Sequence, residues 1–453
     1  MTTPATPWDL PAGFTWGTAT AAYQIEGAVT EDGRGPSVWD TFCAEPGRVR
    51  DGHTGAVACD HYHRWAEDVA LMADLGVDAY RFSVAWPRIQ PDGRGAPNAA
   101  GLDFYDRLVD ALLARGITPT PTLFHWDLPQ ALEDAGGWLA RDSAERFAEY
   151  AGHVAARLGD RVRTWITLNE PFIHMAWGYA LGVHAPGHAL LLDALPAAHH
   201  QLLGHALAAR VLREHGAERV LVSNNLTPVT AASDTAADRA AADAYDTLHN
   251  RLFTDPLLLG RYPDLSAYGH DSTALPFVEP GDLDLIGGSI DGLGVNYYNP
   301  TLIAEGEPDS PLPFTSVEIT GVARTAFDWP VVPEGLTTLL TGLGERYRDA
   351  LPPIWITENG CSTAEGDDDV ERIAFLDGHI AAVAAAVKAG IDVRGYFVWS
   401  LMDNFEWAEG YHQRFGLIHV DFPSGTRTPR ASYRWLRDRL APTSTDGVAH
   451  RPA

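Results

Sequence analysis

The sequence predicts a (β/α)8 barrel of the α/β class. Eight short apolar segments rich in β-branched and aromatic residues are each followed by a longer segment with helical spacing. Several of these helical segments end at a glycine, as at Gly76 and Gly116. Such alternation indicates parallel strands joined by crossover helices. Because a minimal barrel needs only ~250 residues, we expect the excess in long loops at 27–60, 172–192 and 300–333.

The predicted elements follow one another in order along the chain. Strands are expected at 14–20, 77–84, 117–124, 162–168, 219–223, 290–295, 354–357 and 393–399. Helices are expected at 61–75, 102–114, 143–158, 194–214, 238–252, 334–348, 370–389 and 432–439. No Ser/Gly-rich linker interrupts the pattern, so residues 1–453 are predicted to form a single domain. We expect an ordered core at about 8–440 and a frayed tail at 441–453.

Charge and composition exclude several classes of function. The chain has 33 basic and 60 acidic residues, a net charge of −27, and a single lysine, Lys388. Schiff-base and pyridoxal-phosphate enzymes need a desolvated lysine, whereas Lys388 ends an Ala/Val-rich helical segment, where a solvated cation is expected. A Gly-Lys-Ser/Thr phosphate-binding loop is missing. The negative charge, without a basic patch, disfavours nucleic acid as a partner.

The cysteines and the apolar segments bear on location. Cys43, Cys59 and Cys361 form an odd set outside any CxxC pair, which is typical of small packed residues in a reducing cytosol. Residues 1–10 have neither the basic nor the apolar region of a signal peptide. No apolar stretch is long enough to span a bilayer. We therefore predict a cytoplasmic protein with no membrane partner.

Two glutamates directly follow predicted strands, at the end of a barrel where catalytic residues lie. Glu170 follows the fourth strand and Glu358 the seventh. One such glutamate alone would most simply pair with an arginine at the barrel rim. Two on the same face, beside amides, an imidazole and indoles, favour another interpretation. Glycosidic cleavage needs one carboxyl group as proton donor and another as nucleophile or base.

Other side chains at the strand ends suit a sugar ring. Amides, imidazole and carboxylates bind hydroxyl groups, and indoles offer flat apolar faces. These candidates are Gln24, Arg81, His125, Trp126, Asn169, Asn296, Tyr298, Trp399, Glu406 and Trp407. Taken alone, Trp399 and His125 would fit the core equally well, and Asn296 could cap a strand.

Six segments resemble glycoside hydrolase family 1, the β-glucosidase family. They are FTWGTATAAYQIEG at 14–27, RFSVAWPR at 81–88, LNEP at 168–171, NYY at 296–298, ITENG at 356–360 and WSLMDNFEW at 399–407. Each is a weak motif alone, but six in order at strand ends are specific. The resemblance extends from about residue 14 to about residue 440 and implies a single catalytic (β/α)8 barrel.

The resemblance also implies a retaining mechanism. Glu358 would be the nucleophile and Glu170 the acid/base, with their carboxyl groups about 5–5.5 Å apart. Arg81 would pair with Glu358 and keep it charged. Tyr298 matches the family tyrosine that donates a hydrogen bond to the nucleophile. The two glutamates must therefore differ in protonation.

The family pattern assigns the remaining candidates to the bound sugar. Gln24, His125 and Glu406 match residues that bind the 3-, 4- and 6-hydroxyls, and Asn169 matches the residue at the 2-hydroxyl. Trp399 matches the platform under the ring, and the resemblance also implies a cis peptide between Trp399 and Ser400. Trp407 is expected to supply a second indole ring at the sugar, and Trp126 to form part of the wall of the site. Asn296 is expected to support the site near the nucleophile, and Phe415 to close the pocket.

Two positions refine the expected substrate. Relatives that hydrolyse 6-phosphosugars lack a carboxylate at the position of Glu406 and place a lysine nearby, whereas this chain has Glu406 and no lysine there. Phe172 stands where many β-glucosidases of the family carry tryptophan, so the aglycone preference is open. Because both residues are flat and apolar, apolar or aryl aglycones remain compatible.

We therefore predict a retaining exo-β-glucosidase acting on oligosaccharides and on aryl or alkyl glucosides, with a role in carbohydrate metabolism and cellulose degradation. The expected partner is a small β-glucoside or cello-oligosaccharide, with no cofactor and no metal. Alternatives are a broad-specificity β-galactosidase or β-fucosidase, or a transglycosylase. A non-catalytic sugar-binding relative is disfavoured, because both glutamates are present. The oligomeric state is left open.

Overall fold

Eight parallel strands close into a barrel in the computed structural model, which describes residues 8–364 and 369–441. Around the barrel they lie in the order β1-β11-β10-β7-β5-β4-β3-β2, so that β1 pairs with both β2 and β11. The barrel strands are β1 (Thr15–Ala19), β2 (Ala79–Ser83), β3 (Thr118–Phe124), β4 (Thr164–Asn169), β5 (Arg219–Asn225), β7 (Gly292–Asn296), β10 (Ile354–Asn359) and β11 (Val393–Trp399). This closure confirms the predicted (β/α)8 fold.

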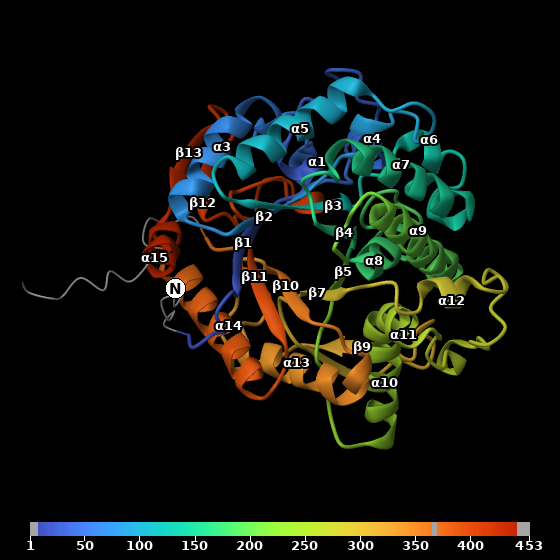
Figure 1. Cartoon of the computed structure of the whole chain (residues 1–453). Coiled ribbons are helices and arrows are strands. Elements are labelled where there is room, and N and C mark those ends of the chain that lie inside the picture. Colours follow the sequence, from blue (N-terminus) through green and yellow to red (C-terminus); the bar gives the residue numbers. More distant parts are fainter. Residues whose placement is uncertain (1–7, 365–368, 442–453) are drawn as a thin grey trace, which may run out of the picture.

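Helices connect the strands and surround the barrel (Figure 1). The longer helices are α3 (His61–Leu75), α5 (Ala99–Leu113), α7 (Asp142–Leu158), α9 (Leu195–Glu214), α10 (Ala236–Asp246), α11 (Leu252–Leu259), α13 (Pro333–Tyr347), α14 (Val370–Lys388) and α15 (Ala431–Leu440). Shorter helices are α1 (Ala22–Ile25), α2 (Val38–Ala44), α4 (Trp86–Ile89), α6 (Gln130–Glu133), α8 (Pro171–Ile173) and α12 (Asp282–Ile286). The range predicted for α3 is confirmed residue for residue.

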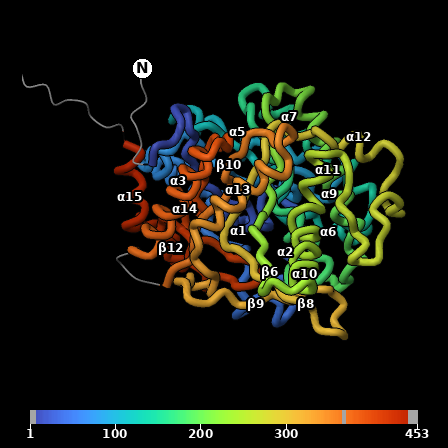
Figure 2. The backbone as a smooth tube through the Cα atoms, turned by 90° about the horizontal axis from the view of Figure 1, so that it is seen from below, coloured from blue at the N-terminus to red at the C-terminus, as the bar shows by residue number. Residues whose placement is uncertain are grey.

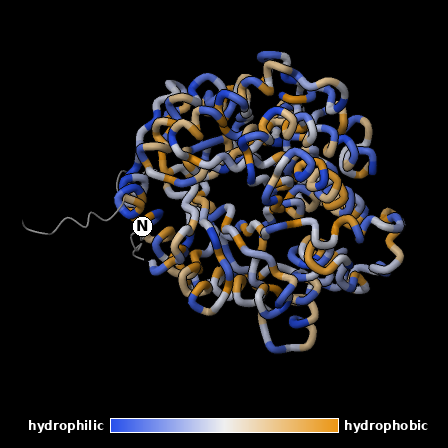
Figure 3. Tube along the Cα trace, viewed as in Figure 1, coloured by the Kyte–Doolittle hydropathy of each residue, from blue (hydrophilic) through white to orange (hydrophobic). Residues whose placement is uncertain are grey.

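Local sequence explains these elements. The strands of a parallel barrel are covered on both faces, so they form continuous apolar runs, and β2 is buried at every position. Helix α7 instead buries Phe147, Tyr150, Val154 and Leu158, which recur at helical spacing on one face. Figure 3 shows the resulting alternation of hydrophilic and hydrophobic residues along the surrounding helices.

Two predicted segments differ from the structure. The helix predicted at 238–252 is divided, because α10 ends at Asp246 and a π-helical turn, Thr247–Arg251, leads into α11. The loop predicted at 300–333 contains β8 (Thr301–Glu305) and β9 (Phe314–Val317), which form a small sheet with β6 (Val229–Ala231) beside α10 (Figure 2). Pairing outside the barrel gives this long insertion backbone hydrogen bonds of its own.

The other long loops are also partly ordered into helices. The loop at 27–60 contains α2, whose first turn is closed by a capping box between Ser37 and Asp40. The loop at 172–192 begins in α8 and continues as a second π-helical segment, His174–Ala180. The predicted tail at 441–453 lies outside the described residues except for Ala441. Across the described part of the chain, no helix combines the length and apolarity needed to cross a bilayer.

A buried carboxylate, Asp403, organises the segment after β11. This segment leads into the hairpin of β12 (Ile418–Asp421) and β13 (Thr426–Pro429), which the sequence reasoning missed. Arg430 donates to both oxygens of Asp403 at 2.8 and 2.9 Å, and the backbone N–H of Gly416 donates at 3.0 Å. Burial would raise the pKa of Asp403, but bonds from His419 and Arg430 lower it to about 2.

Replacing Asp403 by alanine should therefore destabilise the fold strongly. The change leaves the Arg430 guanidinium without its partner in a nearly buried site, which costs about 3–5 kcal/mol of unfolding free energy. Urea denaturation followed by tryptophan fluorescence measures this cost. The matched control is Asp421→Asn, an exposed carboxylate on β12, which should change the unfolding free energy by less than ~0.5 kcal/mol. Equal stabilities for the two variants would contradict the assignment.

Candidate active site

A cavity of about 500 Å³ lies at the carboxyl ends of the barrel strands, within the ~300–1,000 Å³ typical of small-molecule sites. Ten of the side chains singled out in the sequence line it: His125, Trp126, Glu170, Phe172, Tyr298, Glu358, Trp399, Glu406, Trp407 and Phe415. Four others lie behind this lining and bond to it: Gln24, Arg81, Asn169 and Asn296. The structure thus brings all fourteen together.

Glu358, at the end of β10, is held at both carboxylate oxygens. Arg81 Nη1 donates to Oε1 at 2.5 Å, and the Tyr298 hydroxyl donates to Oε2 at 2.7 Å. Arg81 is 1% exposed and Glu358 is 3% exposed, so this is a buried ion pair. A guanidinium in contact favours the charged form of the carboxylate. Burial and, secondarily, the proximity of Glu358 raise the pKa of Tyr298 well above its usual value, so this residue remains a donor.

Glu170 has a contrasting environment. It follows β4 in a left-handed backbone conformation with φ of 44°, and its N–H donates to the carbonyl of Ser223 at 2.7 Å. The Asn296 amide donates to Oε1 at 2.8 Å. Burial, followed by the negative charge of Glu358, raises the pKa of Glu170 to about 8. At neutral pH one of the two glutamates therefore carries a proton.

Asn169 connects the two glutamates from behind. Its Oδ1 accepts hydrogen bonds from Arg81 Nη2 at 2.6 Å and from the Asn296 amide at 3.0 Å. Its amide then faces Nε2 of His125 at 2.9 Å. Burial and, secondarily, Arg81 lower the pKa of His125 well below its usual value, so the ring is neutral. Since Nε2 accepts from Asn169, the proton lies on Nδ1, a buried atom without a protein partner.

Gln24 and Glu406 form another polar corner of the site. The Gln24 amide donates to the Phe405 carbonyl at 2.9 Å and to Glu406 Oε2 at 3.4 Å, while its own Oε1 is buried without a partner. Burial and then the charge of Glu358 raise the pKa of Glu406 to about 8. The two side chains therefore offer both donors and acceptors, as sugar hydroxyls require.

Indole rings form the apolar wall of the same cavity. Trp126 and Trp407 pack with ring centroids 4.7 Å apart, and Trp399 lies parallel to His125 at 5.8 Å. The Trp399–Ser400 peptide is cis, as the family resemblance implied. A side chain at Gly360 would collide with the carbonyl oxygen of Trp399, which explains the glycine after β10.

An apolar outer part of the cavity escaped the sequence reasoning. It is lined by Met175, Trp177, Leu181, Leu191, Leu192, Leu195, Phe327 and Trp329. Trp177, Leu181 and Leu191 are 43–50% exposed, which is unusual for large apolar side chains. They lie in a π-helical segment, directly after it and at the start of a short 3₁₀ helix, Leu191–Ala194, where no periodic pattern reveals which residues face inward. The only available signal was a run of apolar residues in a long loop.

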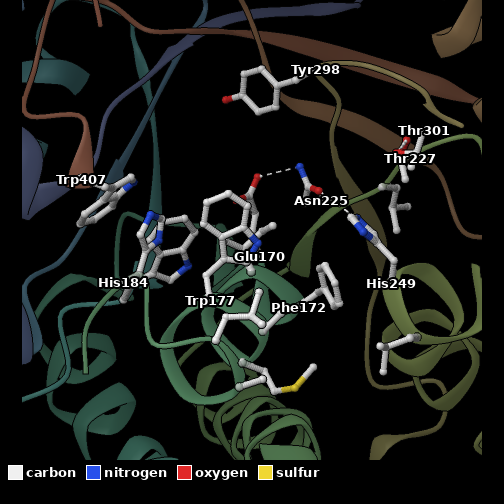
Figure 4. A pocket seen from close by; sticks show the side chains of 18 of the residues that line it. Glu170, Phe172, Trp177, His184, Asn225, Thr227, His249, Tyr298, Thr301 and Trp407 are labelled. Atoms are coloured by element: carbon white, nitrogen blue, oxygen red, sulfur yellow. Dashed lines mark hydrogen bonds between the residues drawn. The ribbon is translucent and has the colours of Figure 1, made fainter. Parts of the chain in front are cut away.

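Asn225 and His249 were also missed. Asn225 ends β5 and donates to Oε1 of Glu170 at 3.4 Å, and Nε2 of His249 lies 3.0 Å from Oδ1 of Asn225. Figure 4 shows Asn225 between these two side chains. Polar side chains at the ends of predicted strands are candidate site residues, and the same rule applied to the fifth strand would have identified Asn225. No comparable signal marks His249, which lies in the π-helical turn before α11.

One group of possible metal ligands is found within the described residues, and it includes none of the cavity-lining side chains. Asp51, His53 and His412 bring ligand atoms within 4.8 Å of one another. His412 Nε2 already pairs with Asp51 at 2.7 Å, and His53 Nδ1 accepts the N–H of Tyr411 at 3.2 Å. These polar atoms therefore have partners within the protein.

Comparisons with known proteins agree with this geometry. The family model described as Glycosyl hydrolase family 1 matches residues 7–443. A thermostable beta-glucosidase B from Thermobispora bispora is 53% identical over 441 residues, which cover 95% of this chain and 90% of that protein. A bifunctional beta-D-glucosidase/beta-D-fucosidase from Bifidobacterium breve is 45% identical over 460 residues, covering 95% and 98%.

A solved structure shares the fold. The beta-glucosidase from Thermotoga maritima in complex with deoxynojirimycin matches with a TM-score of 0.91 and 42% sequence identity, covering 95% of this chain and 98% of that one. The fold, the family model and relatives of this similarity lead to one conclusion. The chain belongs to glycosyl hydrolase family 1.

Proposed function

We infer that this protein is a retaining exo-β-glucosidase that releases terminal non-reducing β-D-glucosyl residues. The observation that carries this inference is the contrast between two neighbouring glutamates. Glu358 is paired with Arg81, whereas burial and the nearby negative charge keep a proton on Glu170. One ionised and one protonated carboxyl group are the two reagents that double displacement requires. We also propose that residues 1–453 form one catalytic domain.

In the first step, Glu358 acts as nucleophile. Its carboxylate oxygen forms a bond to the anomeric carbon while the bond from that carbon to the aglycone oxygen breaks. The proton of Glu170 passes to the departing oxygen. Arg81 and Tyr298 hold Glu358 in place, and the product is a covalent glycosyl-enzyme.

In the second step, the roles reverse. Glu358 has lost its charge in the ester, so the electrostatic reason for protonating Glu170 disappears and Glu170 becomes a base. It removes a proton from water as the water oxygen bonds to the anomeric carbon. The ester bond breaks, Glu358 leaves as a carboxylate, and the sugar is released with its original anomeric configuration.

The proposed sugar contacts use the inner residues of the cavity. We assign hydroxyl binding to Gln24, His125, Asn169 and Glu406, and ring packing to Trp399 and Trp407. The unpartnered atoms of Gln24 and His125 support this assignment, because a sugar hydroxyl would satisfy them. Asn296 and Trp126 would hold Glu170 and Asn169 in place.

Other glycones and acceptors are compatible with the same site. The named activity of the Bifidobacterium breve relative favours fucosides as a second substrate, and β-galactosidase activity and transglycosylation use the same two glutamates. For the aglycone side, the outer wall of Leu, Met and Trp side chains supports aryl or alkyl groups, and we also propose cello-oligosaccharides and a role in cellulose breakdown.

Three free, buried cysteines support a cytoplasmic location.

Removing the nucleophile should abolish turnover. Glu358→Gly is expected to lower kcat for p-nitrophenyl β-glucoside by a factor on the order of 10⁶, because the covalent step is lost. Release of nitrophenolate measures the effect. Glu307→Gly, which removes an exposed carboxylate outside the cavity lining, should retain the wild-type rate. A wild-type rate in Glu358→Gly would overturn the assignment, and no turnover of any aryl β-glycoside by the wild type would overturn the function.

The pH profile should report the proton of Glu170. Because its raised pKa lies at about 8, Glu170 is protonated at neutral pH and loses its proton as the pH rises through that value. We therefore expect kcat/KM for phenyl β-glucoside to fall on the basic side. Glu170→Gln should remove this limb of the profile and lower kcat/KM by about 10²–10⁴. A basic limb that survives the substitution would show that another group controls it.

The apolar wall should govern the affinity for lipophilic aglycones. Leu192→Asp places a charge on this wall and should raise KM for octyl β-glucoside about 10-fold or more, since each buried CH₂ contributes ~0.8 kcal/mol. KM for methyl β-glucoside should change little. Leu285→Asp, at an exposed leucine of α12, is the control. Equal changes for both glucosides would contradict this role of the wall.

A further inference from the structure

A chain of hydrogen bonds reaches Glu170 from outside the residues assigned above. The Asn225 amide donates to Oε1 of Glu170 at 3.4 Å. Oδ1 of Asn225 lies 3.0 Å from Nε2 of His249, and Nδ1 of His249 lies 3.0 Å from the hydroxyl of Tyr245. Figure 4 shows the first three of these side chains in a row, with both connecting bonds. The chain thus links β5, the π-helical turn and α10.

The chemistry of the groups fixes the direction of these bonds. The Asn225 NH₂ group faces Oε1 of Glu170 and the Asn225 oxygen faces His249. This orientation is the one required once Glu170 has given up its proton, because an ionised carboxylate can only accept. That oxygen can only accept, so Nε2 of His249 carries the proton and Nδ1 accepts from the Tyr245 hydroxyl. Every member then donates toward Glu170. A histidine with the other tautomer would place two acceptors against each other.

The surroundings hold His249 in this neutral state. Burial lowers the pKa of His249 to about 4, although Asp246 nearby opposes the shift, and burial raises that of Tyr245 to about 12. The ring of Phe172 packs against His249 with centroids 4.0 Å apart and planes inclined by 34°. Phe172, which stands where many β-glucosidases of the family carry tryptophan, therefore contacts a member of this hydrogen-bond chain directly.

The π-helical turn at Thr247–Arg251 places the histidine. Tyr245 and His249 are four residues apart and lie on the same side of the helix, while the wider turn interrupts the regular α-helical path between α10 and α11. Such turns are rare and occur frequently at functional sites. The same irregularity that divided the predicted helix at 238–252 therefore coincides with a group aimed at the acid/base.

We propose that Tyr245, His249 and Asn225 form a one-directional hydrogen-bond relay that orients the carboxyl group of Glu170 for proton transfer. The proposal rests on the function inferred above. His249 is a positioning residue, because it acts through Asn225 and contacts neither Glu170 nor the cavity's reacting atoms. Without His249, the Asn225 amide can rotate, and Glu170 loses a donor that favours its ionised form.

Other charges also act on Glu170, and they must stay constant in a test. Glu358 raises its pKa, and Arg81 and the Asn296 amide lower it, as does Asn225. Glu170 in turn interacts with Tyr298 and Glu406. None of these groups is altered by a change at His249, so the relay can be tested separately.

The test uses the full chain with three variants. His249→Phe keeps a ring against Phe172 but removes both nitrogen atoms, His249→Gln keeps an N–H that can reach Asn225, and Tyr245→Phe removes only the first donor. His379→Phe, a buried histidine on α14 whose Nδ1 bonds to a backbone carbonyl, is the matched control. kcat/KM is measured against pH for phenyl and for 2,4-dinitrophenyl β-glucoside. This constant reports the first step, and dinitrophenolate departs without protonation.

We expect His249→Phe to lower kcat/KM for phenyl β-glucoside about 10-fold, the effect of losing one oriented donor to a carboxyl group that becomes charged as it gives up its proton. The value for 2,4-dinitrophenyl β-glucoside should change by less than about 2-fold, because the general acid is not needed there. The basic limb for phenyl β-glucoside should move to higher pH. His249→Gln should restore most of the loss, and Tyr245→Phe should show a smaller loss with the same dependence on the leaving group.

Equal losses for both substrates, or an unchanged rate for phenyl β-glucoside in His249→Phe, would overturn the relay. So would the same leaving-group dependence in His379→Phe. If His249→Phe does not fold, as judged by its melting curve, Tyr245→Phe is compared with the wild type instead. The relay is then supported only if kcat/KM falls for phenyl β-glucoside and not for 2,4-dinitrophenyl β-glucoside. Inactivity of the wild type toward both glucosides would instead overturn the proposed function.

Discussion

The site depends on a shortage of positive charge. The carboxyl groups of Glu170, Glu358 and Glu406 are among those that line the cavity, and Arg81 is bonded directly to just one of these three. Carboxylates that are close together and shielded from water cannot all ionise at neutral pH. Burial and the neighbouring carboxyl groups raise the pKa of Glu170 and of Glu406 to about 8, so both retain protons at neutral pH, whereas Glu358 lies beside the guanidinium. The proposed division of roles between a nucleophile and an acid therefore depends on where one arginine lies.

The barrel fixes the position of that arginine. Arg81 belongs to β2, but its guanidinium donates to Thr122 on β3, to Asn169 on β4 and to the Thr357 carbonyl and Glu358 on β10. These strands meet only when the barrel closes. The ion pair is thus a product of the whole topology, and any distortion of the barrel would alter the protonation of the site as well as its shape.

The sequence predicted most of the fold and the inner half of the site for the same reason. Buried parallel strands and amphipathic helices produce strong patterns in the sequence. The end of a predicted strand is therefore a definite position, at which a side chain such as Glu358 can be identified. Irregular segments leave no such pattern. The π-helical turns, the β6–β8–β9 sheet and the leucines around the outer cavity depend on tertiary contacts, so their inward-facing residues, among them His249, became evident only in three dimensions.

The single lysine has a consequence for how the molecule can be handled. Lys388 is exposed at the last position of α14, the helix that runs between β10 and β11. In a (β/α)8 barrel such a helix ends where the next strand begins, on the face opposite the carboxyl ends of the strands. A reagent that modifies side-chain amines therefore has one target, Lys388, on the face opposite the cavity. Coupling to a solid support through Lys388 would present every attached molecule with its cavity turned toward the solution.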